Sequence, residues 1–151
     1  MNPPETSLKI TKVEGATRQA EAAIEAFIRG EFDIAITLAG ASEGMLESST
    51  AFPFFRDTPM AQGVEKKEWI SALNAERDWL KHASGPESLQ LEPWHAAVMI
   101  MRAASKLEKW TPRMEEFKEW LYKNADKILK AEAEGLEPTL PIRLVANPMR
   151  R

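Results

Sequence analysis

The chain has 151 residues, of which 44% are hydrophobic and 28% charged, and its formal net charge is −3. This composition is typical of one ordinary soluble domain, and the slight negative charge predicts no overall attraction to nucleic acid or anionic lipid. Because there is no cysteine and there are only two histidines, disulfides and thiolate catalysis are excluded, and we expect no metal and no cofactor.

Neither a targeting segment nor a membrane span is expected. The first fifteen residues, MNPPETSLKITKVEG, lack the basic start and apolar core of a signal peptide. The longest purely apolar run, AAVMIM at 96–101, is far too short to cross a bilayer. We therefore expect a cytoplasmic protein without a membrane partner.

The spacing of apolar residues predicts an all-α fold with five helices, over residues 17–29, 32–47, 64–83, 93–109 and 112–133. Thr17 is the expected cap of the first helix, Gly30 ends it, and Gly85-Pro86 ends the third. Proline opens the fourth and fifth helices, at Pro93 and Pro112. The fourth is apolar on more than one face, which predicts that it is the central, most buried helix.

We therefore expect a five-helix antiparallel bundle over residues 15–134. An extended N-terminal arm over 1–14 precedes it, and an extended, proline-rich C-terminal tail over 135–151 follows it. Residues 48–63 form a long loop with three phenylalanines, which we expect to be packed down by its own aromatic side chains. The predicted core residues are Trp69, Leu73, Leu80, Val98, Met101, Phe117 and Leu121.

Two polar residues stand out in the predicted helices. Glu43, next to Ser42, interrupts the otherwise apolar segment AITLAGASEGML. Its carboxylate is either a functional group held at a helix interface or a residue that faces solvent or pairs with a basic neighbour. His95 lies in the first turn of the fourth helix, where the helix dipole disfavours a protonated imidazole, and it is interpreted as a structural or half-exposed residue.

The segment ERDWLKH, residues 76–82, contains an arginine, four residues and then a histidine. Arg77 and His82 at this spacing resemble the signature of the HEPN family of small helical-bundle ribonucleases, in which a polar residue, here Asp78, follows the arginine. The surrounding pattern also resembles an uncharacterised bacterial all-helical family. The resemblance extends over roughly residues 17–130, but its specific part is six residues long. In HEPN proteins the motif usually opens the last helix of the bundle, whereas two substantial helices follow it here.

The resemblance implies metal-independent cleavage of RNA, in which a ribose 2′-hydroxyl attacks the adjacent phosphate. His82 suits proton transfer because histidine titrates near neutral pH, and the Arg77 guanidinium can bind two phosphate oxygens. Asp78 lies one helical turn before His82 and could orient the imidazole. With Arg77, Asp78 and His82 as catalytic candidates, we name Asn74, Lys81 and Glu43 as candidate substrate-binding residues.

A second interpretation explains the same residues without catalysis. A histidine near a helix C-terminus is favoured by the dipole, and acidic neighbours match the basic residues of this helix, so it lacks the positive excess of an RNA-binding surface. The alternative function is a catalytically inactive helical bundle that serves as a protein-interaction or regulatory module. Its partner would bind the 48–63 loop or the C-terminal tail.

Helix geometry links the enzymatic hypothesis to assembly. At about 100° per residue, Arg77 and His82 lie roughly 140° apart around an unbroken helix, so they cannot both face one phosphate. Convergence requires that the helix end early, or that a second chain contribute its own Arg77 or His82. HEPN proteins typically form composite sites at a dimer interface, so we expect a homodimer that takes single-stranded RNA.

Overall fold

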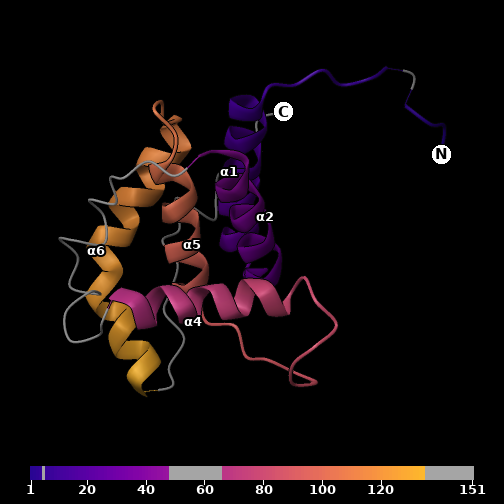
Figure 1. Cartoon of the computed structure of the whole chain (residues 1–151). Coiled ribbons are helices and arrows are strands. Elements are labelled where there is room, and N and C mark those ends of the chain that lie inside the picture. The colour runs from indigo at the N-terminus through magenta and orange to yellow at the C-terminus, as the bar shows by residue number, and fades with distance from the viewer. Residues whose placement is uncertain (5, 48–65, 135–151) are drawn as a thin grey trace.

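The computed structural model describes residues 1–4, 6–47 and 66–134, and it does not describe the side chains of 66–70, 72, 73 and 128–134. It contains five helices: α1 (Lys12–Ile28), α2 (Phe32–Met45), α4 (Lys66–Trp79), α5 (Pro93–Ser105) and α6 (Pro112–Glu134) (Figure 1). No strand occurs in these ranges, which confirms the all-α prediction. The expected 48–63 loop and 135–151 tail lie outside the described residues.

Helices α1 and α2 form a tight hairpin because small side chains line the contact between them. Ala16, Ala20 and Ala39 are fully buried, and the Ser42 hydroxyl donates a 2.7 Å hydrogen bond to the carbonyl oxygen of Ala16. Small residues let the two helix axes approach closely. Gly30 forms the corner between the helices at a φ of 76°, which is costly for any residue with a Cβ.

Helix α5 is the buried centre of the fold, as predicted. Every residue from Ala96 to Ala104 is buried, and α5 packs against α2, α1 and α6. Helix α6 adds an aromatic cluster, in which the Phe27 ring lies 5.2 Å from Phe117 and 5.3 Å from Trp120. Such ring pairs stabilise the core beyond the area they bury.

The predicted core is confirmed for four residues, Val98, Met101, Phe117 and Leu121, each at most 1% exposed. Leu80 is partly buried and packs against this core. The side chains of the other two predicted core residues, Trp69 and Leu73, lie outside the described part of the chain.

The first helix begins earlier than predicted, at Lys12 instead of Thr17. Thr11 is its N-cap: the Thr11 hydroxyl accepts a hydrogen bond from the Glu14 amide, and the Glu14 carboxylate accepts one from the Thr11 amide. This capping box satisfies two amides that have no partner within the helix. Thr17 lies inside the helix, and its hydroxyl donates to the carbonyl oxygen of Val13.

Helix α4 ends at Trp79, before the predicted Gly85-Pro86 stop. The Trp79 indole donates a 2.8 Å hydrogen bond to the carbonyl oxygen of Pro86, which folds the following loop back on the helix end. Gly85 has a φ of 114°, and a Cβ there would lie 2.7 Å from Trp79 Cδ1, so the loop requires glycine at this position. In Figure 1, α4 lies across the other helices and does not run alongside them.

Within the described ranges, no helix combines the length and the apolarity that a bilayer span requires.

Candidate functional site

The Glu43 carboxylate lies buried near the end of α2, where α5 supplies two cations. Glu43 Oε1 is 2.7 Å from Arg102 Nη2 and 4.0 Å from Lys106 Nζ. The Lys106 ammonium also donates to the backbone carbonyls of Glu43 (2.9 Å) and Leu46 (3.4 Å). Lys106 therefore satisfies carbonyls that the helix leaves open at its C-terminus and opposes the negative end of its dipole.

Arg102 connects this ion pair to α4. Its Nη1 donates a 3.1 Å hydrogen bond to Asn74 Oδ1, while Nη2 binds Glu43. We call Glu43, Asn74, Arg102 and Lys106 the polar junction, because they join α2, α4 and α5. Two of the predicted substrate-binding residues, Asn74 and Glu43, thus lie together and are bridged by one guanidinium.

The polar junction is not fully paired internally. Glu43 is only 7% exposed, and its buried Oε2 has no hydrogen-bond partner among the described residues. Within the described part of the chain, the junction therefore contains one buried acceptor, Glu43 Oε2, that receives no hydrogen bond.

Arg77 lies on the face of α4 that is turned toward α2, and its side chain contacts α2 at Gly40. A Cβ at Gly40 would be 2.8 Å from Arg77 Cδ and 3.9 Å from Lys81 Nζ, so both basic side chains lie over the same turn of α2. The Arg77 guanidinium also donates 3.2 Å bonds from Nε and Nη2 to Asp78 Oδ1. The Asp78 side chain is therefore bonded to Arg77, and among the described residues no hydrogen bond joins it to the His82 imidazole, which it was expected to orient.

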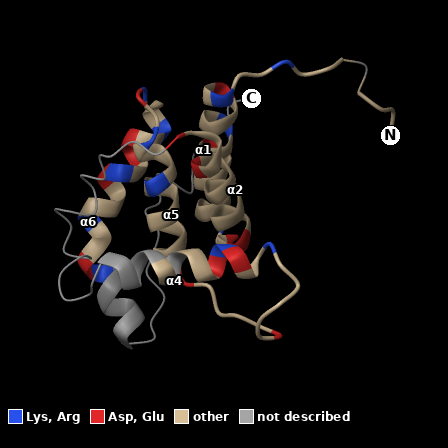
Figure 2. Ribbon diagram, in the orientation of Figure 1, with Lys and Arg blue, Asp and Glu red and all other residues tan. Residues whose placement is uncertain are grey.

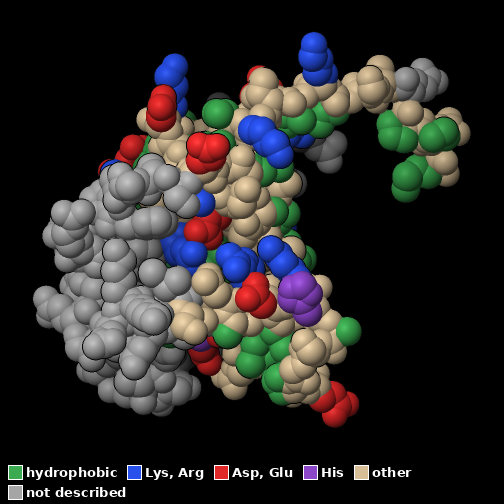
Figure 3. Space-filling view, in the orientation of Figure 1, with side chains coloured by type: hydrophobic (Ala, Val, Ile, Leu, Met, Phe, Trp, Pro, Cys, Tyr) green, Lys and Arg blue, Asp and Glu red, His purple; other side chains and the backbone are tan. Residues whose placement is uncertain are grey.

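His82 follows the end of α4 and is exposed. Its backbone amide donates to the carbonyl oxygen of Asp78, so the chain still winds at this point, and none of the described residues bonds its imidazole. In Figure 3, a histidine side chain lies beside Lys, Arg and Asp or Glu side chains on the face shown. Figure 2 shows acidic and basic residues next to one another on the described half of α4.

A second polar contact joins α4 to α5. Glu76 and His95 lie within ion-pair distance, with side chains only 11% and 14% exposed, and the pair is ionic when the imidazole is protonated. This location agrees with the interpretation of His95 as a structural residue. Because both side chains are nearly buried, the contact holds α4 on α5.

The sequence analysis missed Arg102 and Lys106, which complete the polar junction. The signal was present: two cations spaced by four residues interrupt the apolar segment AAVMIMRAASKL, and this spacing puts them on one face of a helix. Among the described residues, no group of three His, Asp or Glu side chains is arranged to hold a metal ion.

Comparison with models of protein families, with curated proteins and with solved structures found no match to this chain.

Alanine substitutions at two glycines of α2, Gly40 and Gly44, test the contact between Arg77 and α2. Gly40→Ala should displace the Arg77 side chain, because the new methyl group overlaps its stem. Gly44→Ala is the matched control, since nothing lies within 4 Å of its Cβ position. In urea denaturation Gly44→Ala should stabilise the fold by up to about 1 kcal/mol through helix propensity, and Gly40→Ala should gain less or lose stability. Equal gains would show that Arg77 does not lie on Gly40 in solution.

Proposed function

We propose that the protein is a metal-independent endoribonuclease of the HEPN type, with Arg77 and His82 as its catalytic residues. The observation that supports this proposal most is the arrangement at the end of α4. Arg77 and Lys81 lie over one turn of α2, and the imidazole of His82 is exposed and free of other bonds among the described residues. These groups are a phosphate-binding pair of cations and a proton-transfer group on one short segment.

The reaction requires no external reagent. The ribose 2′-hydroxyl loses its proton to a base and its oxygen attacks the adjacent phosphorus, while the bond from phosphorus to the 5′ oxygen breaks and that oxygen takes up a proton. The products are a 2′,3′-cyclic phosphate and a 5′-hydroxyl. His82 transfers the protons, and Arg77 with Lys81 stabilises the charge of the phosphorane.

The polar junction has a positioning role in this proposal. Asn74 lies one turn before Asp78 on α4, and its bond to Arg102 fixes the helix against α2 and α5. Glu43, bonded to the same guanidinium, supports this position and is itself too buried to contact RNA. Asn74 and Glu43 are therefore proposed as positioning residues, and Lys81 as a substrate-binding residue.

A fluorescent single-stranded RNA incubated in EDTA tests the proposal. The wild-type protein should cleave it and leave 2′,3′-cyclic phosphate ends, and His82→Ala or Arg77→Ala should lower the rate by about 100-fold or more. Arg29→Ala is the control, because Arg29 is an exposed arginine outside α4. It lies at the C-terminal end of α1, where it pairs with Glu31. A protein that does not cleave RNA, cleaves only with magnesium, or is unaffected by both substitutions contradicts the proposal.

The proposal also predicts that the active form is a homodimer. Because α4 ends at Trp79, no unbroken helix separates Arg77 from His82, and the expectation of a second copy rests on the HEPN resemblance, in which two chains share one composite site. Light scattering should give twice the 17.0 kDa chain mass at micromolar concentration. Mixing the inactive Arg77→Ala and His82→Ala proteins should restore part of the activity, because a mixed dimer contains one intact composite site. A monomeric mass, or a mixture that stays inactive, rules out the shared site.

A protein-interaction module is the second candidate function, and a specific observation favours it. Leu8, Ile10 and Val13 are 68%, 41% and 58% exposed, and they are close together in sequence on the N-terminal arm and the first turn of α1. Clustered exposed aliphatic residues are typical of binding surfaces.

A further inference from the structure

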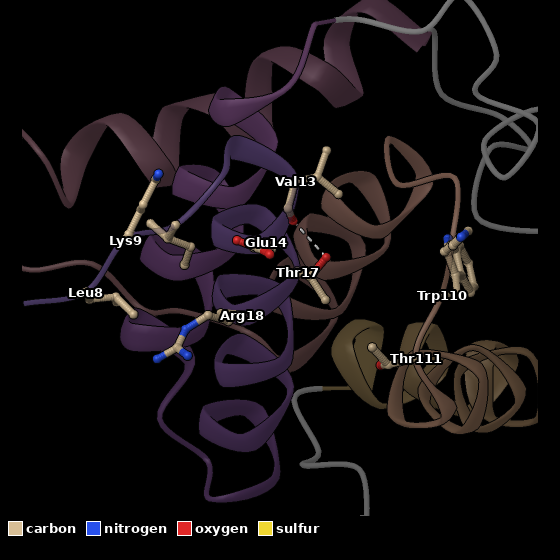
Figure 4. A pocket seen from close by; sticks show the side chains of 10 residues that line it. Leu8, Lys9, Val13, Glu14, Thr17, Arg18, Trp110 and Thr111 are labelled. Carbon is tan, nitrogen blue, oxygen red and sulfur yellow. Dashed lines mark hydrogen bonds between the residues drawn. The ribbon is translucent and has the colours of Figure 1, made fainter.

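A groove lies beside the N-terminal end of α1, where the N-terminal arm, the first turns of α1 and the loop before α6 meet. Its volume is about 480 Å³, within the usual range of ligand sites. Figure 4 shows Val13 and Thr17 of α1 between the arm residues Leu8 and Lys9 and the loop residues Trp110 and Thr111.

The groove offers apolar side chains and open backbone groups together. Leu8, Ile10 and Val13 line it and are each more than 40% exposed. Residues 7–10 belong to no helix or strand, and within the described chain they form no backbone hydrogen bonds with one another or with other segments. An extended segment with free amides and carbonyls can pair with a second extended chain, as in strand addition to an exposed edge.

One wall of the groove is already fixed. The Trp110 indole donates a 2.8 Å hydrogen bond to the carbonyl oxygen of Ala104, and the Lys118 ammonium lies 4.9 Å from the centre of the ring. These two contacts hold the ring in place without a ligand. A preformed wall lowers the entropy cost of binding.

Positive side chains predominate around the groove, although the whole chain has a formal net charge of −3. Lys9, Arg18 and Lys109 line it, whereas its single carboxylate, Glu14, accepts a hydrogen bond from the Thr11 amide within the capping box. The Glu14 carboxylate keeps its charge in the capping box, so three cations and one carboxylate line the groove and their formal charges sum to +2. The complementary ligand carries carboxylates next to aliphatic groups.

We propose that this groove binds an extended segment of a partner protein in which aliphatic residues alternate with Asp or Glu. The aliphatic side chains pack on Leu8, Ile10 and Val13, the carboxylates face the cations, and the backbone pairs with the arm. Aliphatic lining favours a peptide over RNA, because bases stack on aromatic faces and Lys118 already covers the single tryptophan of the groove. The proposal is independent of the ribonuclease activity and of its site on α4.

The test is selection of random peptides, about twelve residues long, displayed on phage against the full chain, followed by fluorescence anisotropy with the selected peptide. The selected sequences should combine aliphatic residues with Asp or Glu, and binding should weaken as salt is raised. Val13→Glu and Arg18→Glu should each weaken binding by about tenfold or more.

Two substitutions outside the groove serve as controls. Ile34→Glu changes another exposed aliphatic residue, and Arg29→Glu changes an exposed cation at the C-terminal end of α1, beyond the range of unscreened charge from the groove, so both should leave peptide binding unchanged. Failure to select any peptide, or equal weakening by the control variants, overturns the proposal. Competition by an oligouridine of about ten nucleotides that Arg18→Glu abolishes would instead assign the groove to RNA.

Discussion

The buried carboxylate of Glu43 constrains this fold more than any other single group. Removing an ionised carboxylate from water costs several kcal/mol unless its surroundings return the lost interactions. Arg102 and Lys106 do so from one face of α5, and Lys106 also binds the last carbonyls of α2. The pairing therefore determines which face of α5 contacts α2 and how the two helices are aligned along their axes. Small apolar side chains alone would allow the helices to slide past one another at this point.

Helix α4 depends on the same guanidinium. Its described contacts with the bundle include Asn74 to Arg102, Glu76 to His95, and the stem of Arg77 on Gly40. Hydrogen bonds and ion pairs require particular distances and directions, whereas apolar contacts tolerate small displacements. Among the contacts that the structure describes for α4, these polar ones therefore constrain most closely the segment that contains the proposed catalytic residues. The N-terminal groove contains none of these residues, so binding there and chemistry on α4 can be tested separately.

The sequence predicts the fold class because apolar residues recur with helical spacing, and it predicts α5 as the centre because α5 is apolar on more than one face. It also contained the Thr11–Glu14 capping box that starts α1, a signal that was overlooked in favour of Thr17. The pairing of Glu43 with Arg102 could not be predicted, because 59 residues separate them and periodicity within one helix says nothing about which helix it meets. For the same reason the sequence indicated a charged segment around Arg77 but could not indicate its contact with Gly40.

A double-mutant cycle between Glu43 and Arg102, measured by urea denaturation, tests most directly whether this pair organises the fold. Glu43→Gln and Arg102→Met should each lower the free energy of unfolding by about 3 kcal/mol, because each removes the closest opposite charge from a buried ion and leaves it only a weaker partner, Asn74 for Arg102 and Lys106 for Glu43. The double variant should lose about 2 kcal/mol less than the sum of the two. The exposed pair of Arg29 and Glu31 is the control and should show a much smaller coupling. Additive losses at Glu43 and Arg102, within about 0.5 kcal/mol, would contradict the account.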